Sequence, residues 1–217
     1  MKMSKVLITV FCAVLLVTVS VLGTLAYLTS QDEVVNTFTV GKVKISLDEA
    51  AVNADGTEIP GADRVKENNY HLIPGQTYVK DPTLTVKAKS EDSYVRMLLT
   101  LNCADEFDAI YAPDKADLTT IFNGYDATNW VYETVTKDTA KNTITYEFRY
   151  KEIVTKSTTD TKLDALFDSI TVPGIFDSKD MESISDLKIT VVGHAIQKTG
   201  FENADEAWAA FDTQMNK

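Results

Sequence analysis

Cysteine is scarce in this chain of 217 residues, which contains only Cys12 and Cys103. Cys12 lies in an apolar N-terminal stretch that we expect to be removed, which leaves Cys103 alone in the mature protein. One thiol cannot form an internal disulfide, so the fold must depend on its hydrophobic core, and about 190 residues are enough for one domain with a substantial core. Cys103 continues an alternating apolar strand, and we predict that it is a buried structural thiol.

Histidine is equally scarce, and the two present, His71 and His194, are far apart in the sequence. A catalytic zinc ion normally needs three protein ligands, and a nucleophilic cysteine needs a neighbouring base. The chain also lacks His-Glu-x-x-His, Gly-x-Ser-x-Gly, a Gly-rich phosphate loop and cysteines paired at metal-binding spacing. We therefore expect no enzyme, no catalytic residue, no metal site and no cofactor. We interpret His194 as a packed or surface residue of a strand.

Basic residues are outnumbered, with 21 Lys and Arg against 32 Asp and Glu. Without Lys2 and Lys5, which precede the apolar stretch, 19 basic residues remain and the formal charge is −13. Nucleic-acid binding needs a basic face that neutralises phosphates, so we expect no nucleic-acid partner. The acidity is typical of a surface or extracellular protein that stays dispersed by self-repulsion. The carboxylates between Asp105 and Asp126 lack the spacing of a calcium loop, and we interpret them as surface groups.

Residues 1–26 have the layout of a secretory signal peptide, in which basic residues are followed by an apolar stretch and then by small residues. Thr24 and Ala26 occupy the −3 and −1 positions of a cleavage site, so cleavage would make Tyr27 the new N-terminus. The alternative is an uncleaved membrane anchor, because about 20 apolar residues are enough to span a bilayer.

Period-two alternation of apolar residues predicts most of the chain that follows to be β-structure. Around Gly41 the alternation shifts by one residue, which predicts a β-bulge and a bent strand. In the next strand we expect Leu84 and Val86 to face inward and Thr83 and Thr85 to face outward. The polar stretch 50–69 predicts a long loop. Strands are predicted at residues 34–40, 43–47, 83–88, 95–103, 130–136, 143–151 and 187–197.

Helical spacing of apolar residues is confined to short segments. Leu163, Leu166, Phe167 and Ile170 form a stripe that predicts a helix over residues 160–170, and Asn203 with Glu206 predicts the start of a C-terminal helix. A helical insertion is expected at about 104–129. Six or more strands with two or three short peripheral helices predict a mainly β fold, an antiparallel β-sandwich, in one domain that spans residues 27–217.

Two segments resemble the TasA and camelysin (CalY) family, whose signal peptides are cut by the dedicated peptidase SipW. The first segment carries the family's pattern at Gly23, Thr24, Ala26, Tyr27, Thr29, Asn36, Thr37, Phe38, Thr39, Gly41, Val43 and Ile45. The second segment, Pro74-Gly75 followed by Lys80-Asp81, is similar to the family's turn before a strand. From Ala104 onward the chain is only compatible with the family.

This resemblance implies a secreted, jelly-roll-like subunit that polymerises with itself into fibres of the biofilm matrix, outside or on the surface of a Gram-positive-type bacterium. Its implied partners are further copies, a SipW-type signal peptidase and an accessory or nucleating matrix protein, with membrane contact only through the signal segment before cleavage. In that family the N-terminal segment of one subunit completes a sheet of the next, which is strand addition at an open edge. Here the donor is the extended segment 27–35, with anchors at Tyr27, Leu28, Val34 and Val35 and a polar middle, Ser30–Glu33.

Two alternatives remain at the level of the sequence. Camelysin-like relatives carry a metallopeptidase label, although this chain shows no recognisable set of ligands and base. The other alternative is a surface protein that keeps residues 1–26 as a membrane tether and does not polymerise. Covalent attachment to the cell wall through Leu-Pro-x-Thr-Gly is not expected, because the motif is absent.

Overall fold

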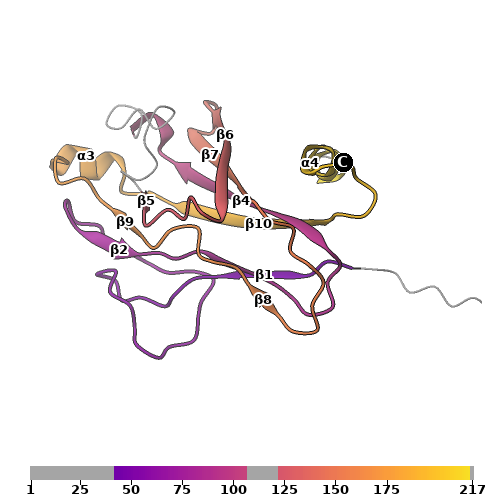
Figure 1. Cartoon of the computed structure of the whole chain (residues 1–217). Helices are drawn as coiled ribbons and strands as arrows, with labels where there is room; N and C mark the ends of the chain where they lie inside the picture. The colour runs from indigo at the N-terminus through magenta and orange to yellow at the C-terminus, as the bar shows by residue number, and fades with distance from the viewer. Residues whose placement is uncertain (1–41, 107–121, 216–217) are drawn as a thin grey trace, which may run out of the picture. The chain divides into compact units, whose positions relative to one another are not determined.

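The computed structural model describes residues 42–106 and 122–215, which fall within one compact unit of the chain (Figure 1). The expected cleavage residues Thr24, Ala26 and Tyr27 lie outside the described residues. So do the expected donor anchors Leu28, Val34 and Val35, the bulge expected at Gly41, and residues 107–121 of the expected helical insertion.

The described chain is mainly β, as predicted, and its strands form antiparallel sheets in two layers of a sandwich. The first layer is a four-stranded sheet in the order β10 (Ile189–Gln197), β4 (Ser93–Asn102), β7 (Thr143–Tyr150) and β6 (Trp130–Asp138). The second layer holds two three-stranded sheets. One has the strand order β1 (Ile45–Asp48), β3 (Thr83–Val86), β8 (Thr161–Lys162). The other has the strand order β2 (Thr77–Val79), β9 (Ser169–Thr171), β5 (Phe122–Asn123). The helices of the described residues include α3 (Ser178–Ser183) and α4 (Ala204–Met215).

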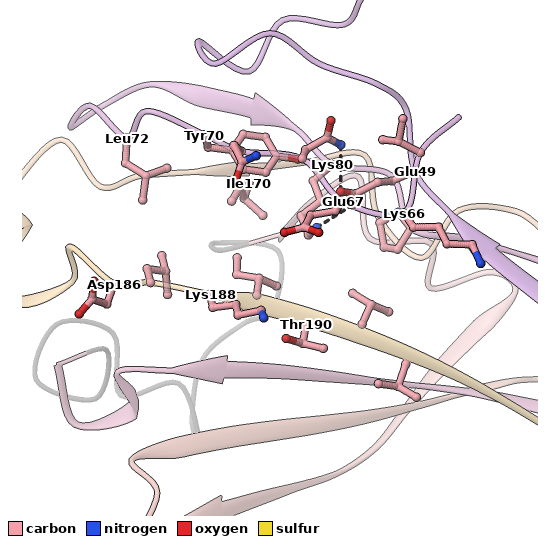
Figure 2. Close-up of a pocket in the computed structure, with 18 of the residues that line it drawn as sticks. Glu49, Lys66, Glu67, Tyr70, Leu72, Lys80, Ile170, Asp186, Lys188 and Thr190 are labelled. Atoms are coloured by element: carbon pink, nitrogen blue, oxygen red, sulfur yellow. Dashed lines mark hydrogen bonds and ion pairs between the residues drawn. The ribbon is translucent and has the colours of Figure 1, made fainter. Parts of the chain in front are cut away.

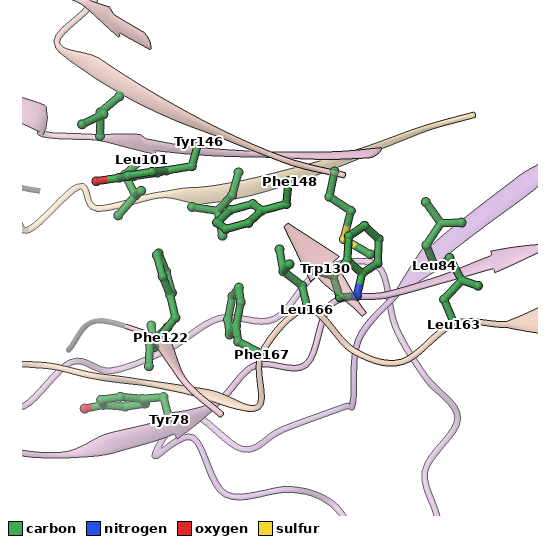
Figure 3. Close-up of a cluster of buried hydrophobic side chains, with 14 of the residues drawn as sticks. Tyr78, Leu84, Leu101, Phe122, Trp130, Tyr146, Phe148, Leu163, Leu166 and Phe167 are labelled. Atoms are coloured by element: carbon green, nitrogen blue, oxygen red, sulfur yellow. The ribbon is translucent and has the colours of Figure 1, made fainter. Parts of the chain in front are cut away.

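The core fills the space between the layers and is built by alternating residues of β4 and β7. Ile144, Tyr146 and Phe148 of β7 are each 1% exposed, so this alternating row packs in the core. They face Phe122 and Phe167 of the second layer, whose ring centroids are 4.7 Å apart (Figure 3). Burial of a large apolar side chain contributes about 1.5–3 kcal/mol, so these aromatic contacts hold the layers together.

The helix predicted over residues 160–170 is wrong, because this segment is extended chain. The amide of Leu163 donates to the carbonyl of Leu84, and that of Leu166 donates to the carbonyl of Pro82. The apolar side chains at 163, 166 and 167 are buried as expected, but a strand neighbour takes the hydrogen bonds that a helix would make internally. A short isolated helix is marginal in water, so the tertiary hydrogen bonds decide the conformation.

Two smaller expectations are also corrected. Thr83 and Thr85 are 2% and 9% exposed rather than outward-facing, because β3 is the central strand of its sheet and the side chain of Arg64 covers Thr83 with a hydrogen bond of 2.9 Å. Cys103 is half-buried with φ of 58° and follows the last residue of β4. Of the helical insertion expected at about 104–129, the structure describes residues 104–106 as helical and Phe122–Asn123 as strand β5.

The two segments without regular strand structure in the second layer meet each other. Residues 80–82 separate β2 from β3, and residues 163–168 separate β8 from β9. The amide of Lys80 donates to the carbonyl of Asp168 at 3.1 Å, so hydrogen bonds continue between the two three-stranded sheets. Within residues 42–106 and 122–215, no helix is both long and apolar enough to cross a lipid bilayer.

Candidate functional site: a groove between two open strand edges

Strands β1 and β10 are each the outer strand of a sheet, and they lie next to each other at one side of the sandwich. β1 pairs with β3 alone and β10 pairs with β4 alone among the described residues. An outer strand presents a row of backbone N–H and C=O groups that have no partner in its own sheet. This side of the molecule therefore has two neighbouring edges at which a further strand could be added.

The pairing of β10 with β4 shows which of its backbone groups face outward. Just before β10, the carbonyl of Lys188 accepts from the amide of Asn102, and just after it the amide of Lys198 donates to the carbonyl of Asp92. In an antiparallel pair, alternate residues direct both backbone groups at the same neighbour. The even-numbered residues of β10 therefore bond β4, and the odd-numbered ones direct their backbone groups at the open edge: Ile189, Val191, Gly193, Ala195 and Gln197.

The same reasoning applies to β1. The carbonyl of Lys44 accepts from the amide of Lys87, so Ser46 and Asp48 bond β3, and Ile45 and Leu47 direct their backbone groups away from it. The outward side of β1 is closed at its end, where Glu49 and Val65 exchange two hydrogen bonds of 2.8 Å. The free length of the β1 edge is therefore short, and β10 offers the longer edge.

A groove of about 1350 Å³ lies between these strands. The side chains of Tyr70, Leu72 and Ile170 line it on the side of the second layer, and Lys188 and Thr190 line it along β10 (Figure 2). The volume exceeds the roughly 300–1,000 Å³ that is typical of small-molecule sites. Apolar groups from both layers together with open backbone groups fit an extended peptide better than a compact ligand.

Gly193 sets how closely β10 approaches the second layer. A Cβ atom at this position would lie 2.6 Å from Cδ1 of Leu84 and 3.7 Å from Cδ1 of Ile45. Leu84 is fully buried and has little room to move aside. A side chain at residue 193 would push the two edges apart, so the width of the groove depends on this glycine.

The edge of β10 has none of the usual protection against strand addition. Its nine residues, Ile189–Gln197, contain no Lys, Arg, Asp, Glu or Pro. By contrast β6, at the opposite edge of the same sheet, has an irregularity between Tyr132 and Thr134 and carries Glu133, Lys137 and Asp138. Bulges and charges protect an edge strand from pairing with a further strand. The β6 edge has this protection, and the β10 edge does not.

A hydrogen-bonded cluster of charged groups forms one wall of the groove. Nζ of Lys80 lies 2.6 Å from Oε2 of Glu49, and the two side chains are 8% and 9% exposed. Tyr70 packs beside them and donates its hydroxyl to the carbonyl of Val79 at 3.1 Å. Burial, followed by the charge of Glu49, raises the pKa of Tyr70, so this phenol stays neutral at any physiological pH.

The outer face of β10 is covered by α4. The guanidinium of Arg96, a residue that is 3% exposed, lies 4.5 Å from the ring of Trp208 and 5.3 Å from that of Phe211. Its Nε donates to Nδ1 of His194 at 3.2 Å. Phe211 also stacks on the His194 ring, with the centroids 4.6 Å apart. The helix begins where predicted, since Oδ1 of Asn203 accepts from the amide of Glu206.

The residues that the sequence suggested for chemistry are not brought together as a site. His194 is a packed strand residue under α4, and His71 is an exposed loop residue. Cys103 lies at the far end of β4 from Ser93, and burial raises the pKa of its thiol. In the part of the chain that the structure describes, no three His, Cys, Asp or Glu side chains are placed to hold a metal ion.

The groove itself was missed by the sequence analysis. The signal that could have pointed to it is the absence of charge from Ile189 to Gln197, in a chain where 24% of residues are charged. Comparison of the chain with family models, with curated proteins and with solved structures finds no match.

Proposed function

We propose that this chain is a secreted structural subunit that polymerises into extracellular biofilm-matrix fibres by strand donation, as its resemblance to the TasA and camelysin family implies. The donor is the segment 27–35 of one copy, and the acceptor is the β10 edge of the next copy. The observation that carries the proposal is the nine-residue open edge without charges that faces a groove of about 1350 Å³.

Donor and acceptor match in length, and both contain apolar side chains. Segment 27–35 has nine residues, as many as β10. Its apolar residues lie at its two ends, where they would contact the apolar groove side chains. Its polar middle contains Asp32 and Glu33. The groove is lined by charged residues of both signs, which are Lys66, Lys80, Lys188, Asp48, Glu49, Glu67, Glu182 and Asp186. A donated strand would gain backbone hydrogen bonds along the open edge and side-chain contacts within the groove.

The position of the donor next to the expected cleavage site also explains why polymerisation would begin only after export. The proposed cleavage after Ala26 makes the donor the N-terminal end of the mature chain, whereas the precursor keeps it joined to an apolar membrane segment. A donor that is tethered to the membrane cannot reach successive subunits of a growing fibre. Signal cleavage would therefore permit polymerisation as well as release.

The proposal predicts different assembly by two proteins that differ only at the N-terminus. Protein that begins at Tyr27 forms filaments in negative-stain electron microscopy, and protein that begins at Asn36 stays monomeric, because it lacks the donor but keeps the whole described domain. Both should show the same β-rich circular dichroism spectrum.

Two outcomes would contradict the proposal. The first is filament formation by both proteins. The second is a monomer that begins at Tyr27 and melts at a higher temperature than the protein from Asn36, since the segment would then fill the groove of its own chain.

A further inference from the structure

The cluster in the wall of the groove has an arrangement that supports a covalent reaction. The carboxylate of Glu49 contacts two side chains at once: Oε2 lies 2.6 Å from Nζ of Lys80, and Oε1 accepts from Nδ2 of Asn68 at 2.9 Å. An amine and a carboxamide are therefore held by the two oxygens of one carboxylate. Figure 2 shows Glu49 and Lys80 facing one another at this wall.

Burial makes this contact different from a surface ion pair. As whole residues, Lys80 and Glu49 are both 7% exposed. The Tyr70 ring lies beside the amine, with Nζ of Lys80 6.0 Å from the ring centroid. Such a pair contributes little to stability, because desolvation offsets the attraction between the charges. In a site with little water, transfer of the shared proton from the amine to the carboxylate leaves both groups neutral, and a neutral amine is a nucleophile.

The carboxamide of Asn68 is oriented and polarised by backbone groups. Its Oδ1 accepts from the amide of Val52 at 3.1 Å, and its Nδ2 donates to the carbonyl of Ala50 at 2.8 Å as well as to Glu49. A backbone N–H aimed at this oxygen stabilises the negative charge that develops when a nucleophile adds to the carbon. The carboxamide is thus fixed as an electrophile beside a buried amine.

We propose that Lys80 and Asn68 form an intramolecular isopeptide bond and that Glu49 catalyses the reaction by proton transfer. Nζ of Lys80 gives a proton to Glu49 and adds to Cγ of Asn68, with the negative charge on Oδ1 facing the Val52 amide. Glu49 then passes this proton to Nδ2, the bond between Cγ and Nδ2 breaks, and ammonia leaves. Nζ loses its second proton to Glu49, which releases it to solvent, where it is taken up by the ammonia. The products are a secondary amide and ammonia, so no oxidant or cofactor is needed.

The bond would tie the loop after β1 to the segment between β2 and β3. Asn68 belongs to the long loop 50–69 and Lys80 directly follows β2, so the link fixes one wall of the groove against being pulled away. The reaction occurs within one folded chain and does not depend on polymerisation, so its failure and the failure of the proposed function can be observed separately.

Intact-mass spectrometry of the purified full chain tests the proposal. The expected mass is about 17 Da below the sequence mass, which is the loss of one ammonia. Trypsin cuts after Lys66, so Asn68 and Lys80 fall in one fragment. With cleavage after Lys80 blocked by the link, the expected product is a branched peptide of residues 67–87, about 17 Da below its sequence mass, in which the side chains of residues 68 and 80 close an internal ring. The variants Glu49→Gln, Lys80→Arg and Asn68→Ala should each lack the branched peptide.

A matched control and a fold measurement keep the result decisive. Lys66→Arg and Asn69→Ala change neighbouring residues of the same loop outside the cluster and should keep the branched peptide. Circular dichroism checks that Glu49→Gln is folded. The proposal is overturned by an unmodified wild-type mass, or by a loss of about 17 Da without the branched peptide, which would indicate a succinimide at an asparagine.

Discussion

At the scale of single residues, His194 shows how a buried side chain couples β10 to α4. Burial, and after it the charge of Arg96, lowers the pKa of His194, while the carboxylates of Asp212 and Glu147 act in the opposite direction. Nδ1 of this histidine accepts the hydrogen bond from Arg96, so protonation would place a second cation against a guanidinium. The neutral imidazole is therefore the form that fits the folded protein.

This coupling predicts that the folded state loses stability as pH falls through the ordinary histidine pKa of 6.5. The unfolded chain takes up the proton more readily than the folded one, so the contribution is fully present above this value and decreases below it. We expect the melting temperature of the protein from Asn36 to fall between pH 7.5 and pH 5.5, and His194→Gln to reduce the fall. Differential scanning calorimetry at a series of pH values measures it.

His71→Gln is the matched control, because His71 is exposed in a loop; it should keep the pH dependence of the wild type. An unchanged fall in the His194→Gln protein would show that other groups cause it. Carboxylates whose pKa is lowered, such as Asp138 and Asp177, lose their contribution at more acidic pH, outside this range.

At the scale of strands and helices, the alternation of backbone groups along β10 predicts opposite effects for proline at two adjacent positions. Val191→Pro removes an N–H at the open edge and keeps the pairing with β4, so the protein should fold but fail to form filaments. Val192→Pro removes an N–H that bonds β4, and we expect it to lower the free energy of unfolding by about 1–3 kcal/mol.

Thermal melts and pelleting of protein that begins at Tyr27 measure these effects. Val191→Thr is the control, because it keeps both the backbone N–H and a β-branched side chain, and it should polymerise like the wild type. Polymerisation of the Val191→Pro protein at the wild-type rate would argue against β10 as the acceptor.

The strands could largely be predicted from the sequence, because period-two alternation in β4 and β7 reflects directly which face is buried. The segment 160–170 could not. Its apolar spacing fits a helix as well as irregular chain under a sheet, and the choice depends on hydrogen bonds to Leu84 and Pro82, about 80 residues away. Helix α3 was not predicted, although Asp177 and Asp180 form a capping box at its start. This pair is a local signal that the sequence does contain.

At the scale of the whole molecule, the candidate site depends on contacts that no local pattern reveals. The groove joins β1 with β10, which are more than 140 residues apart in sequence, and the cluster in its wall joins Glu49, Asn68 and Lys80. The proposed donor, residues 27–35, follows from the family resemblance and from its position after the expected cleavage site, whereas the proposed acceptor depends on the sheet order and the register of β10. In the proposed fibre, each subunit would carry both a donor segment and an acceptor edge.

Hydrogen exchange at single-residue resolution tests the central claim most directly. The alternation along β10 predicts that the amides of Ile189, Val191, Gly193 and Ala195 exchange rapidly in the monomer that begins at Asn36 and become protected in filaments that begin at Tyr27. The amides of Thr190 and Val192 should be protected in both, because they bond β4. Equally fast exchange of the odd-numbered amides in monomer and filament would contradict strand donation to β10.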